Sequence, residues 1–310
     1  MALLDVILTY DCNVACDYCT ISPAMRGRAL ATATVVDAMR RGRAVGYDAV
    51  SFTGGEPTLR RDLPGLVRVA RTLGYVEIKI QSNGLLFAHG PNVDRLVAAG
   101  ANLFHVSIHT HVEAAYDRMV RTPGAYPLML AGLRNLVARG LRLRADVIIT
   151  RETYPRLPDA VRWLAAEGVR HVDFWFVSLT DGNRENVESL PRMRDAVPFL
   201  REALATARAL GLEARSLHVP RCLLGDDAGH AYDPGADRVR VVTPDAVFDL
   251  DRSKLAGQVH VAACDAGCLH RPVCPGVRPD YLERYGDREL VAVPPAARPS
   301  QGGSGASSSS

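Results

Sequence analysis

The sequence opens with a short apolar run that leads directly into three closely spaced cysteines, Leu3-Leu-Asp-Val-Ile-Leu-Thr-Tyr-Asp-Cys12-Asn-Val-Ala-Cys16-Asp-Tyr-Cys19. The apolar run has the length and composition of a buried β-strand. Three of the seven cysteines thus follow one strand, at the spacing C-x3-C-x2-C. Structural zinc sites are normally closed by four protein ligands, and iron–sulfur clusters by four cysteines. The stretch therefore predicts a metal centre with one position left for a distant or an external ligand.

The residue before the last of these cysteines is aromatic, Tyr18. With it, the triplet resembles the signature of the radical S-adenosylmethionine (SAM) superfamily. The resemblance implies that Cys12, Cys16 and Cys19 are catalytic and hold a 4Fe–4S cluster. It also implies that SAM occupies the fourth iron and is cleaved reductively to a 5′-deoxyadenosyl radical, with Tyr18 beside the adenine or the cluster. The spacing by itself leaves two alternatives, a zinc knuckle that lacks one ligand and buried thiols that happen to cluster.

The composition is that of a globular protein. The chain has 310 residues, of which 47% are hydrophobic, enough for one large domain or for a domain with an appendage. No apolar run approaches the length of a membrane span, and the first residues lack the features of a secretory signal. The net charge is +3 with the basic residues spread along the chain, so we expect no nucleic acid and no membrane as a partner. The cysteines are expected to be metal ligands in a reducing cytoplasm.

From residue 3 to about residue 210, short apolar runs alternate with stretches of helical periodicity. Strands are expected at 3–9, 48–53, 75–81, 102–108, 143–150 and 170–178. Helices are expected at 33–45, 62–73, 91–99, 112–119, 126–139, 156–167 and 195–210. Six consecutive βα units predict an α/β fold with a parallel sheet and the helices outside it. They fit the partial (β/α)6 TIM-type barrel that the resemblance implies, in which the active site follows the carboxyl ends of the strands.

Three parts are expected along the chain. Residues 1–212 form the radical SAM partial barrel, and residues 213–292 form a C-terminal cysteine-rich auxiliary-cluster region. Within this region, 238–242 and 246–250 predict one hairpin. Residues 293–310 are expected to be a disordered tail, because their composition is dominated by Gly and Ser.

Glycines and small polar side chains mark the ends of the second, third and fourth strands. The second strand ends in Gly54-Gly55-Glu56-Pro57, where two glycines let the backbone approach a ligand closely. By resemblance, this motif binds the amino group of SAM, and Glu56 adds a carboxylate. Ser82 and Asn83 end the third strand and Ser107 ends the fourth; the resemblance implies contacts with the ribose and the methionyl carboxylate. Ordinary helix-leading turns and caps are the alternative for these residues.

The other four cysteines all lie in the last third of the chain, at Cys222, Cys264, Cys268 and Cys274. Four is the number that closes a 4Fe–4S cluster or a zinc site. The arrangement resembles the auxiliary-cluster extensions called Twitch and SPASM domains, which implies one Twitch-like cluster that is fully ligated by protein. Zinc is the alternative, although these spacings fit the usual C-x2-C pairs poorly. A fully ligated cluster implies electron transfer or a structural role.

A few residues indicate the substrate side. His109 after the fourth strand is a candidate for proton transfer, Arg121 for contact with an anionic substrate, and Trp175 on the sixth strand for lining a pocket. A structural role in packing is the alternative interpretation of these residues. The first strand begins at residue 3, so the N-terminal peptide-binding module of many peptide-modifying relatives is not expected. This favours a small molecule, or a peptide delivered by a separate protein.

Together these features predict a radical SAM enzyme that abstracts a hydrogen atom from a small metabolite or a peptide. The expected outcome is oxidative C–H functionalisation in natural-product or cofactor biosynthesis. The expected cofactors are SAM and two 4Fe–4S clusters, with a flavodoxin- or ferredoxin-type protein as the reductant. The alternative is a redox-neutral enzyme of the same family, such as an epimerase, a rearrangement enzyme or a methyl transferase, in which the second cluster is structural or relays electrons.

Overall fold

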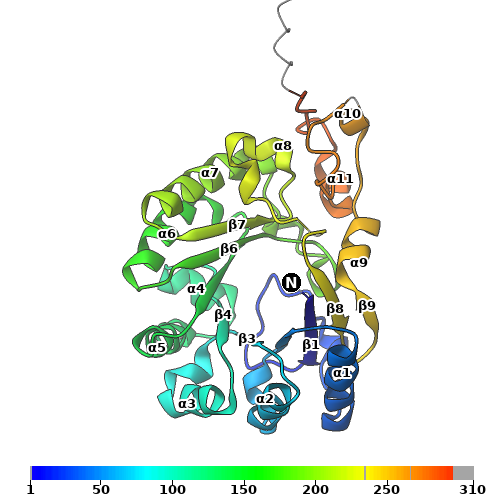
Figure 1. Ribbon diagram of the computed structural model, residues 1–310. Helices are drawn as coiled ribbons and strands as arrows, with labels where there is room; N and C mark the ends of the chain where they lie inside the picture. The colour runs from blue at the N-terminus through cyan, green and yellow to red at the C-terminus, as the bar shows by residue number, and fades with distance from the viewer. Residues whose placement is uncertain (1, 234, 266, 296–310) are drawn as a thin grey trace, which may run out of the picture.

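The chain folds around one nine-stranded sheet that curls into an open barrel (Figure 1). The computed structural model describes residues 2–233, 235–265 and 267–295. In sheet order, the strands are β7 (Glu213–Leu217), β6 (His171–Phe176), β5 (Leu143–Ile149), β4 (Leu103–Ser107), β3 (Glu77–Ser82), β2 (Ala49–Gly54), β1 (Ala2–Thr9), β8 (Arg238–Val242) and β9 (Val247–Asp249). Neighbouring strands from β7 to β8 are parallel, and β9 runs antiparallel to β8.

Helices cover the outer face of this sheet, and shorter helices follow in the C-terminal part. The outer helices are α1 (Thr32–Ala44), α2 (Leu63–Thr72), α3 (Gly90–Ala99), α4 (Glu113–Met119), α5 (Ala125–Ala138), α6 (Leu157–Ala166) and α7 (Met193–Ala209). The C-terminal helices are α8 (Arg221–Leu224), α9 (Leu250–Ala256), α10 (Ala262–Asp265) and α11 (Pro279–Tyr285). The six predicted βα units and the partial-barrel fold are therefore confirmed, and each predicted boundary lies within two residues of the observed one.

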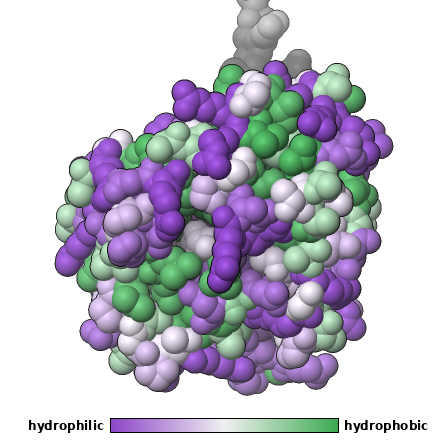
Figure 2. Space-filling view, turned by 90° about the horizontal axis from the view of Figure 1, so that it is seen from below, coloured by the Kyte–Doolittle hydropathy of each residue, from purple (hydrophilic) through white to green (hydrophobic). Residues whose placement is uncertain are grey.

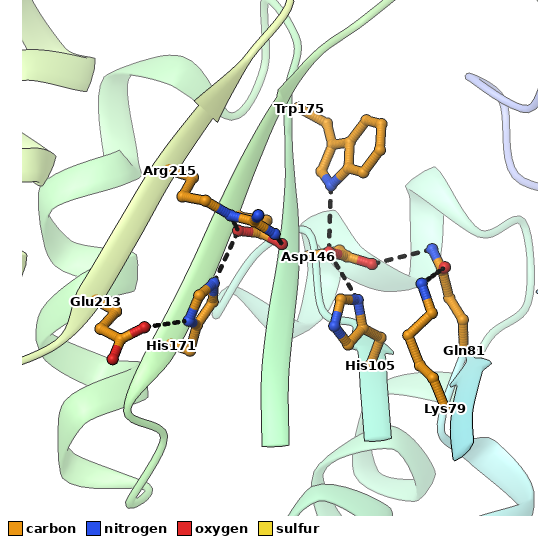
Figure 3. Close-up of polar contacts among 9 residues, drawn as sticks. Lys79, Gln81, His105, Asp146, His171, Trp175, Glu213 and Arg215 are labelled. Atoms are coloured by element: carbon orange, nitrogen blue, oxygen red, sulfur yellow. Dashed lines mark hydrogen bonds and ion pairs between the residues drawn. The ribbon is translucent and has the colours of Figure 1, made fainter. Parts of the chain in front are cut away.

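The two faces of the strands carry different kinds of side chain. On β6, Phe174 and Phe176 are fully buried in the hydrophobic core, whereas Trp175 between them points into the barrel interior (Figure 3). This follows from the two-residue period of a strand. The same period on β5 buries Ala145 and Val147 in the core and turns Asp146 into the barrel. An apolar layer thus lies between sheet and helices, and polar side chains line the interior.

The sheet is wider than the sequence predicts. The predicted hairpin is confirmed as β8 and β9, but β8 also pairs in parallel with β1, and β7 adds a strand after the sixth βα unit. No continuous apolar run marks β7, because Glu213 and Arg215 alternate with Ala214 and Ser216 along it. The sheet therefore continues across residue 212, where the barrel region was expected to end.

The two ends of the curled sheet are not paired with each other. In Figure 1, α8, α9, α10 and α11 lie on the side of this opening, so the C-terminal cysteines come to lie beside the barrel. The part of the expected tail from residue 296 to residue 310 is outside the described residues.

The surface seen from below is largely hydrophilic, and the apolar residues on it lie in separate patches (Figure 2). The large apolar side chains gather instead in the core between sheet and helices, as Phe52, Phe87 and Phe104 do. Among the described residues, no helix has both the length and the apolar character that crossing a membrane requires.

Candidate active site

The three N-terminal cysteines lie on a loop that leaves β1 and rests on the end of α4. The backbone N–H of Asp17 donates to the carbonyl of Met119 at 2.9 Å. Two residues earlier, the N–H of Ala15 donates to the carbonyl of Val120 at 3.2 Å. The three thiols are free and half-buried. Backbone bonds to a neighbouring element therefore fix the loop from which all three sulfurs project.

The glycine-rich turn at the end of β2 packs against the start of this loop. The N–H of Gly55 donates to the carbonyl of Thr9 at 2.7 Å. A Cβ at Gly54 would lie 2.3 Å from that same carbonyl oxygen, and a Cβ at Gly55 would lie 2.1 Å from the carbonyl oxygen of Asp11. The φ angle of Gly54 is +131°, which other residues rarely adopt. Both glycines are therefore needed for the close approach of β2 to the cysteine loop.

A cavity of about 150 Å³, here called the loop cavity, lies between the cysteine loop, the glycine turn and the ends of β3 and β4. The predicted residues that line it are Cys12, Cys16, Tyr18, Cys19, Gly54, Gly55, Ser82, Asn83, Ser107 and His109. Arg26 and Gln81 line it as well and were not among the predicted site residues. The fold thus gathers residues from four separate strand ends around one space.

Glu56 and Pro57 are not among the residues lining this cavity. Glu56 is fully buried, and its carboxylate accepts hydrogen bonds from the Ser82 hydroxyl at 2.9 Å and the Asn83 N–H at 2.8 Å. It also accepts bonds from the N–H and the hydroxyl of Thr58, at 3.0 and 2.5 Å. Burial raises the pKa of Glu56, and these donors oppose that shift. The carboxylate therefore holds in place the strand end that forms the cavity wall.

Tyr18 and His109 form another part of the wall. Their ring centroids are 4.8 Å apart in an edge-on arrangement, and His109 has a left-handed φ of 59°. Burial lowers the pKa of His109 to about 3, so its ring is neutral. The Tyr18 hydroxyl is buried beside the Cys16 thiol, and His109 Nδ1 is buried with no hydrogen-bond partner among the described residues. Buried polar atoms normally have partners, so His109 Nδ1 suits a polar ligand.

The four C-terminal cysteines converge on a second cavity, here called the distal cavity. Its lining includes Cys222 from α8, Cys264 from α10, and Cys268 and Cys274 from the loop that follows. Burial, and then the other three cysteines, raise the pKa of Cys222 to about 11, as expected where four thiols lie close together. Mutual backbone bonds between Val259 and Val277, at 2.8 and 2.9 Å, bring the chain back to this point.

Comparison with known proteins agrees with this geometry. The family model described as the radical SAM superfamily matches residues 6–164, which include the cysteine loop, the glycine turn and the ends of β3 and β4. The chain belongs to the radical SAM superfamily. It is thus an enzyme of the radical SAM type, and the family implies a 4Fe–4S cluster and SAM as cofactors.

Two curated relatives carry different names. The PqqA peptide cyclase of Gluconobacter oxydans is 29% identical over 206 residues, which are 66% of this radical SAM chain and 57% of the relative. A probable GTP 3′,8-cyclase of Methanopyrus kandleri is 32% identical over 168 residues, or 53% of each protein. The chain therefore spans about half the length of these curated relatives.

Solved structures share the fold. The crystal structure of Streptococcus suis SuiB bound to S-adenosylmethionine superposes with a TM-score of 0.67 over 91% of this chain and 73% of that one, at 13% identity. The structure of anSMEcpe with bound AdoMet and the Kp18Cys peptide superposes with a TM-score of 0.59 over 69% of this chain and 63% of that one, at 14% identity. At such identities the likeness establishes the partial barrel alone.

The loop cavity fits the cofactors of the radical SAM family. Cys12, Cys16 and Cys19 supply three thiols there, and the other four cysteines line the distal cavity instead. A 4Fe–4S cluster held by three cysteines has one iron left for SAM. Tyr18 and His109 line the same cavity, and the buried Nδ1 atom of His109 has no hydrogen-bond partner among the described residues.

A polar network fills the interior of the radical SAM barrel (Figure 3). Asp146 on β5 accepts hydrogen bonds from Gln81 Nε2 and Trp175 Nε1, both at 3.2 Å. Further along, Arg215 on β7 donates to both oxygens of Asp173 at 2.8 and 2.7 Å. Asp146 therefore orients Gln81, which lines the loop cavity, and Trp175 on the opposite side of the interior.

One corner of this network has the composition of a metal site. His105, Asp146 and Asp173 bring ligand atoms within 4.8 Å of one another. However, both oxygens of Asp173 are already bonded to Arg215, and burial, followed by the charge of Lys79, holds the pKa of His105 well below its usual range. Arg215 thus balances Asp173, and the neutral donors of Gln81 and Trp175 bind Asp146.

Replacing Asp146 by Asn is expected to remove a pH-dependent loss of stability. Burial, and then the charge of Asp173, raise the pKa of Asp146 to about 7. A folded-state pKa above the unfolded value favours the fold at low pH, and this contribution is lost as the pH rises through the folded-state pKa. From about pH 4 to pH 7, the free energy of unfolding of wild type should fall by about 1.4 kcal/mol per pH unit relative to Asp146→Asn. Anaerobic urea unfolding across this range measures the difference, and parallel curves would contradict it.

The three candidates for substrate contact lie in different places. His109 lines the loop cavity. Trp175 faces the barrel interior with its ring 5.5 Å from that of His218, while Arg121 is exposed and lies outside the loop cavity. Sequence reasoning missed Gln81, although it stands next to Ser82 in the same strand-end motif. It also missed Lys254, which no motif marks.

Proposed function

We propose that this chain cleaves SAM reductively at a 4Fe–4S cluster held by Cys12, Cys16 and Cys19, and that it abstracts a hydrogen atom from a substrate. When bound, the cluster and SAM supply the 5′-deoxyadenosyl radical for this step. The observation that carries the proposal is the convergence of the three cysteines with the predicted SAM-binding residues on the loop cavity. The product class we propose is an oxidatively functionalised metabolite or peptide of natural-product or cofactor biosynthesis.

Different residues around the loop cavity would bind different parts of SAM. The exposed backbone at Gly54 and Gly55 would receive the amino group of SAM, and the side chains of Ser82, Asn83 and Ser107 would bond its ribose and carboxylate. Asn83 Nδ2 lies 3.7 Å from Cys12 Sγ, so this strand end and the cysteine loop act on neighbouring parts of the ligand. The protein thus supplies orientation and exclusion of water, and the radical chemistry belongs to the cofactor.

The distal cavity would hold the second cluster. Four cysteine thiols leave no iron without a protein ligand, so a group there would accept an electron rather than bind substrate. A substrate that has lost a hydrogen atom can then lose one electron and one proton, which completes a two-electron oxidation. Support for iron over zinc comes from the sequence spacing of Cys264, Cys268 and Cys274, which differs from the C-x2-C pairs usual in zinc sites.

The substrate class and the reductant rest on weaker support. Two curated relatives are named for acting on a peptide and on a nucleotide, and one solved neighbour is named as bound to a precursor peptide. We propose a substrate from the same range, a small metabolite or a peptide. A flavodoxin- or ferredoxin-type protein would deliver the electron that starts the reaction.

Anaerobically reconstituted protein is expected to bind about eight iron atoms per chain, since each 4Fe–4S cluster contributes four. Cys268→Ala should lower this to about four while the SAM-cleaving cluster remains. Iron and zinc analysis of both proteins, together with EPR after dithionite reduction, measures it. Four iron atoms and one zinc ion in wild type would overturn the second iron–sulfur cluster.

A second measurement, the amount of 5′-deoxyadenosine formed per turnover, tests whether SAM is consumed. A stoichiometric amount indicates consumption of SAM, and a smaller amount indicates a redox-neutral reaction that regenerates it.

A further inference from the structure

We propose that Lys254 and Arg184 bind an anionic group of the substrate, a carboxylate or a phosphoryl group. The site is a cavity of about 570 Å³, here called the anion cavity, to whose lining the β6–α7 loop, α9 and the start of α11 contribute. This inference rests on the proposed function, because it treats the cavity as the substrate site of that reaction. Its volume lies in the range of roughly 300–1,000 Å³ that is usual for ligand pockets.

The anion cavity lies between the two cysteine sites. On one side, the β6–α7 loop that lines it bonds the cysteine loop, from Gly182 N–H to the Thr20 carbonyl and from Asn186 Nδ2 to the Asp17 carbonyl, both at 2.8 Å. On the other side, Gln258 and Arg278 line it, and the residues next to them in sequence, Val259 and Val277, line the distal cavity. A molecule in the anion cavity would therefore lie near both cofactor sites.

Lys254 is placed as a ligand-binding cation. It is half-buried, and its ammonium group makes no hydrogen bond or ion pair with a described residue. The rings of Trp175 and Tyr232 hold it instead, with centroids 5.6 and 5.0 Å from Nζ. Burial lowers the pKa of Lys254 to about 8, and Asp5 on β1 opposes this shift without forming an ion pair. The group is thus charged at neutral pH and unpaired.

The composition of the chain makes this lysine unusual. The sequence has only two lysines among 37 basic residues, and the other, Lys79, lies in the barrel interior beside Gln81. Arginine thus provides almost all of the positive charge. Lysine differs from arginine as a compact charge on a flexible stem. A lysine kept at the edge of a cavity, in a chain that otherwise uses arginine, is consistent with a specific role.

The remaining charges leave the anion cavity positive. Arg278 is bonded to both oxygens of Asp280 at 2.9 Å, and Asp280 also accepts the N–H of Leu179. Arg284 Nη2 lies 3.6 Å from Glu188 Oε1 and forms an ion pair with it. Arg184 has no ion-pair partner among the described residues, and Glu283 is the one lining acid outside these pairs. Two unpaired cations thus face one exposed carboxylate.

His218 adds a neutral ring to the same wall. Its backbone has a left-handed φ of 71°, and Arg278 Nη1 lies 3.2 Å from its Nδ1 atom. The same Nδ1 atom lies 3.2 Å from the carbonyl oxygen of Phe176, which can only accept, so Nδ1 carries the hydrogen and donates it there. Burial, and then the charge of Arg278, lower the pKa of His218 to about 3, so the ring stays neutral. This part of the wall therefore adds no charge to the anion cavity.

The test is calorimetric titration of SAM-loaded holoenzyme with inorganic pyrophosphate and phosphate in one arm, and with succinate and acetate in the other. We expect one arm to bind, and Lys254→Met to weaken binding roughly tenfold or more, as for the loss of a charge-assisted bond. Arg252→Met is the matched control, because Arg252 is an exposed cation on the same helix and should change the affinity less than about twofold. The arm that binds identifies the group as phosphoryl or carboxylate.

Two results would overturn the inference: no binding in either arm, or equal affinity in wild type and Lys254→Met. If Lys254→Met does not fold, NMR of wild type with ¹³C-labelled, reductively methylated lysines replaces it. Lys79→Met keeps only Lys254 and therefore identifies the Lys254 signal. The anion must then shift that signal in wild type. Substrate-free 5′-deoxyadenosine formation is measured on the same samples, and the control variant Arg252→Met should leave it unchanged. If wild type formed no 5′-deoxyadenosine, this result would contradict the proposed function but not the anion site.

Discussion

Cys16→Ala is expected to abolish reductive cleavage of SAM, with 5′-deoxyadenosine formation falling at least about a hundredfold. Loss of an outer partner of a metal site typically costs about 10–100-fold, and Cys16 would bind iron directly. In the structure, its thiol lines the loop cavity between Cys12 and Cys19, on a loop whose backbone is bonded to the end of α4. Only Cys12 and Cys19 line that cavity with it, and the other four cysteines line the distal cavity, so none is free to replace it. Chromatographic measurement of 5′-deoxyadenosine with dithionite as reductant provides the rate.

Cys268→Ala is the matched control for this loss. It removes a half-buried thiol of the same size from the distal cavity and should retain much of the SAM cleavage. Both variants should unfold near the wild-type urea concentration, since Cys16 is only partly buried against the core and Cys268 lies outside it. Undiminished cleavage in Cys16→Ala would contradict the assignment of this loop. Equal loss in both variants would instead show that the two cysteine sets depend on each other.

Those parts of the fold and the site that depend on neighbours in sequence could be predicted. The cysteine spacing, the glycine turn and the βα alternation each extend over a few residues, and a parallel barrel places successive strand ends at one rim. Ser82, Asn83 and Ser107 therefore reach the loop cavity as predicted. The alternation along β6 likewise separates Trp175 from its two buried neighbours.

Features that depend on distant contacts could not be predicted. The pairing of β8 with β1 joins residues more than two hundred positions apart. Lys254 lies on a short helix with no apolar stripe, and only the packing of α9 beside β8 brings its amine to the cavity. Arg121 is predicted to contact an anionic substrate, yet its side chain is exposed and lies outside the loop cavity. Tertiary packing decides whether a polar side chain is buried or exposed, and the periodicity of the sequence does not indicate this.

The buried carboxylate of Glu56 is expected to matter for stability as well as for SAM binding. Its oxygens accept bonds from Ser82, from Asn83 and from both donors of Thr58. Glu56→Ala leaves these buried donors without an acceptor, at about 1–3 kcal/mol for each that finds no other partner. We expect a loss of roughly 3 kcal/mol or more in the free energy of unfolding. SAM should also bind at least about tenfold more weakly, because the strand end that lines the loop cavity is released.

Two further variants separate this role from a direct contact with SAM. Glu56→Gln keeps the shape and one acceptor oxygen but turns an amide N–H toward the donors, so its loss should be intermediate. Glu188→Ala removes an exposed glutamate that pairs with Arg151 and Arg284 at the surface, and it should cost less than about 1 kcal/mol. Urea unfolding and equilibrium dialysis with labelled SAM give the two quantities. If Glu56→Ala weakened SAM binding and left unfolding unchanged, the carboxylate would act on the ligand and not on the strand end.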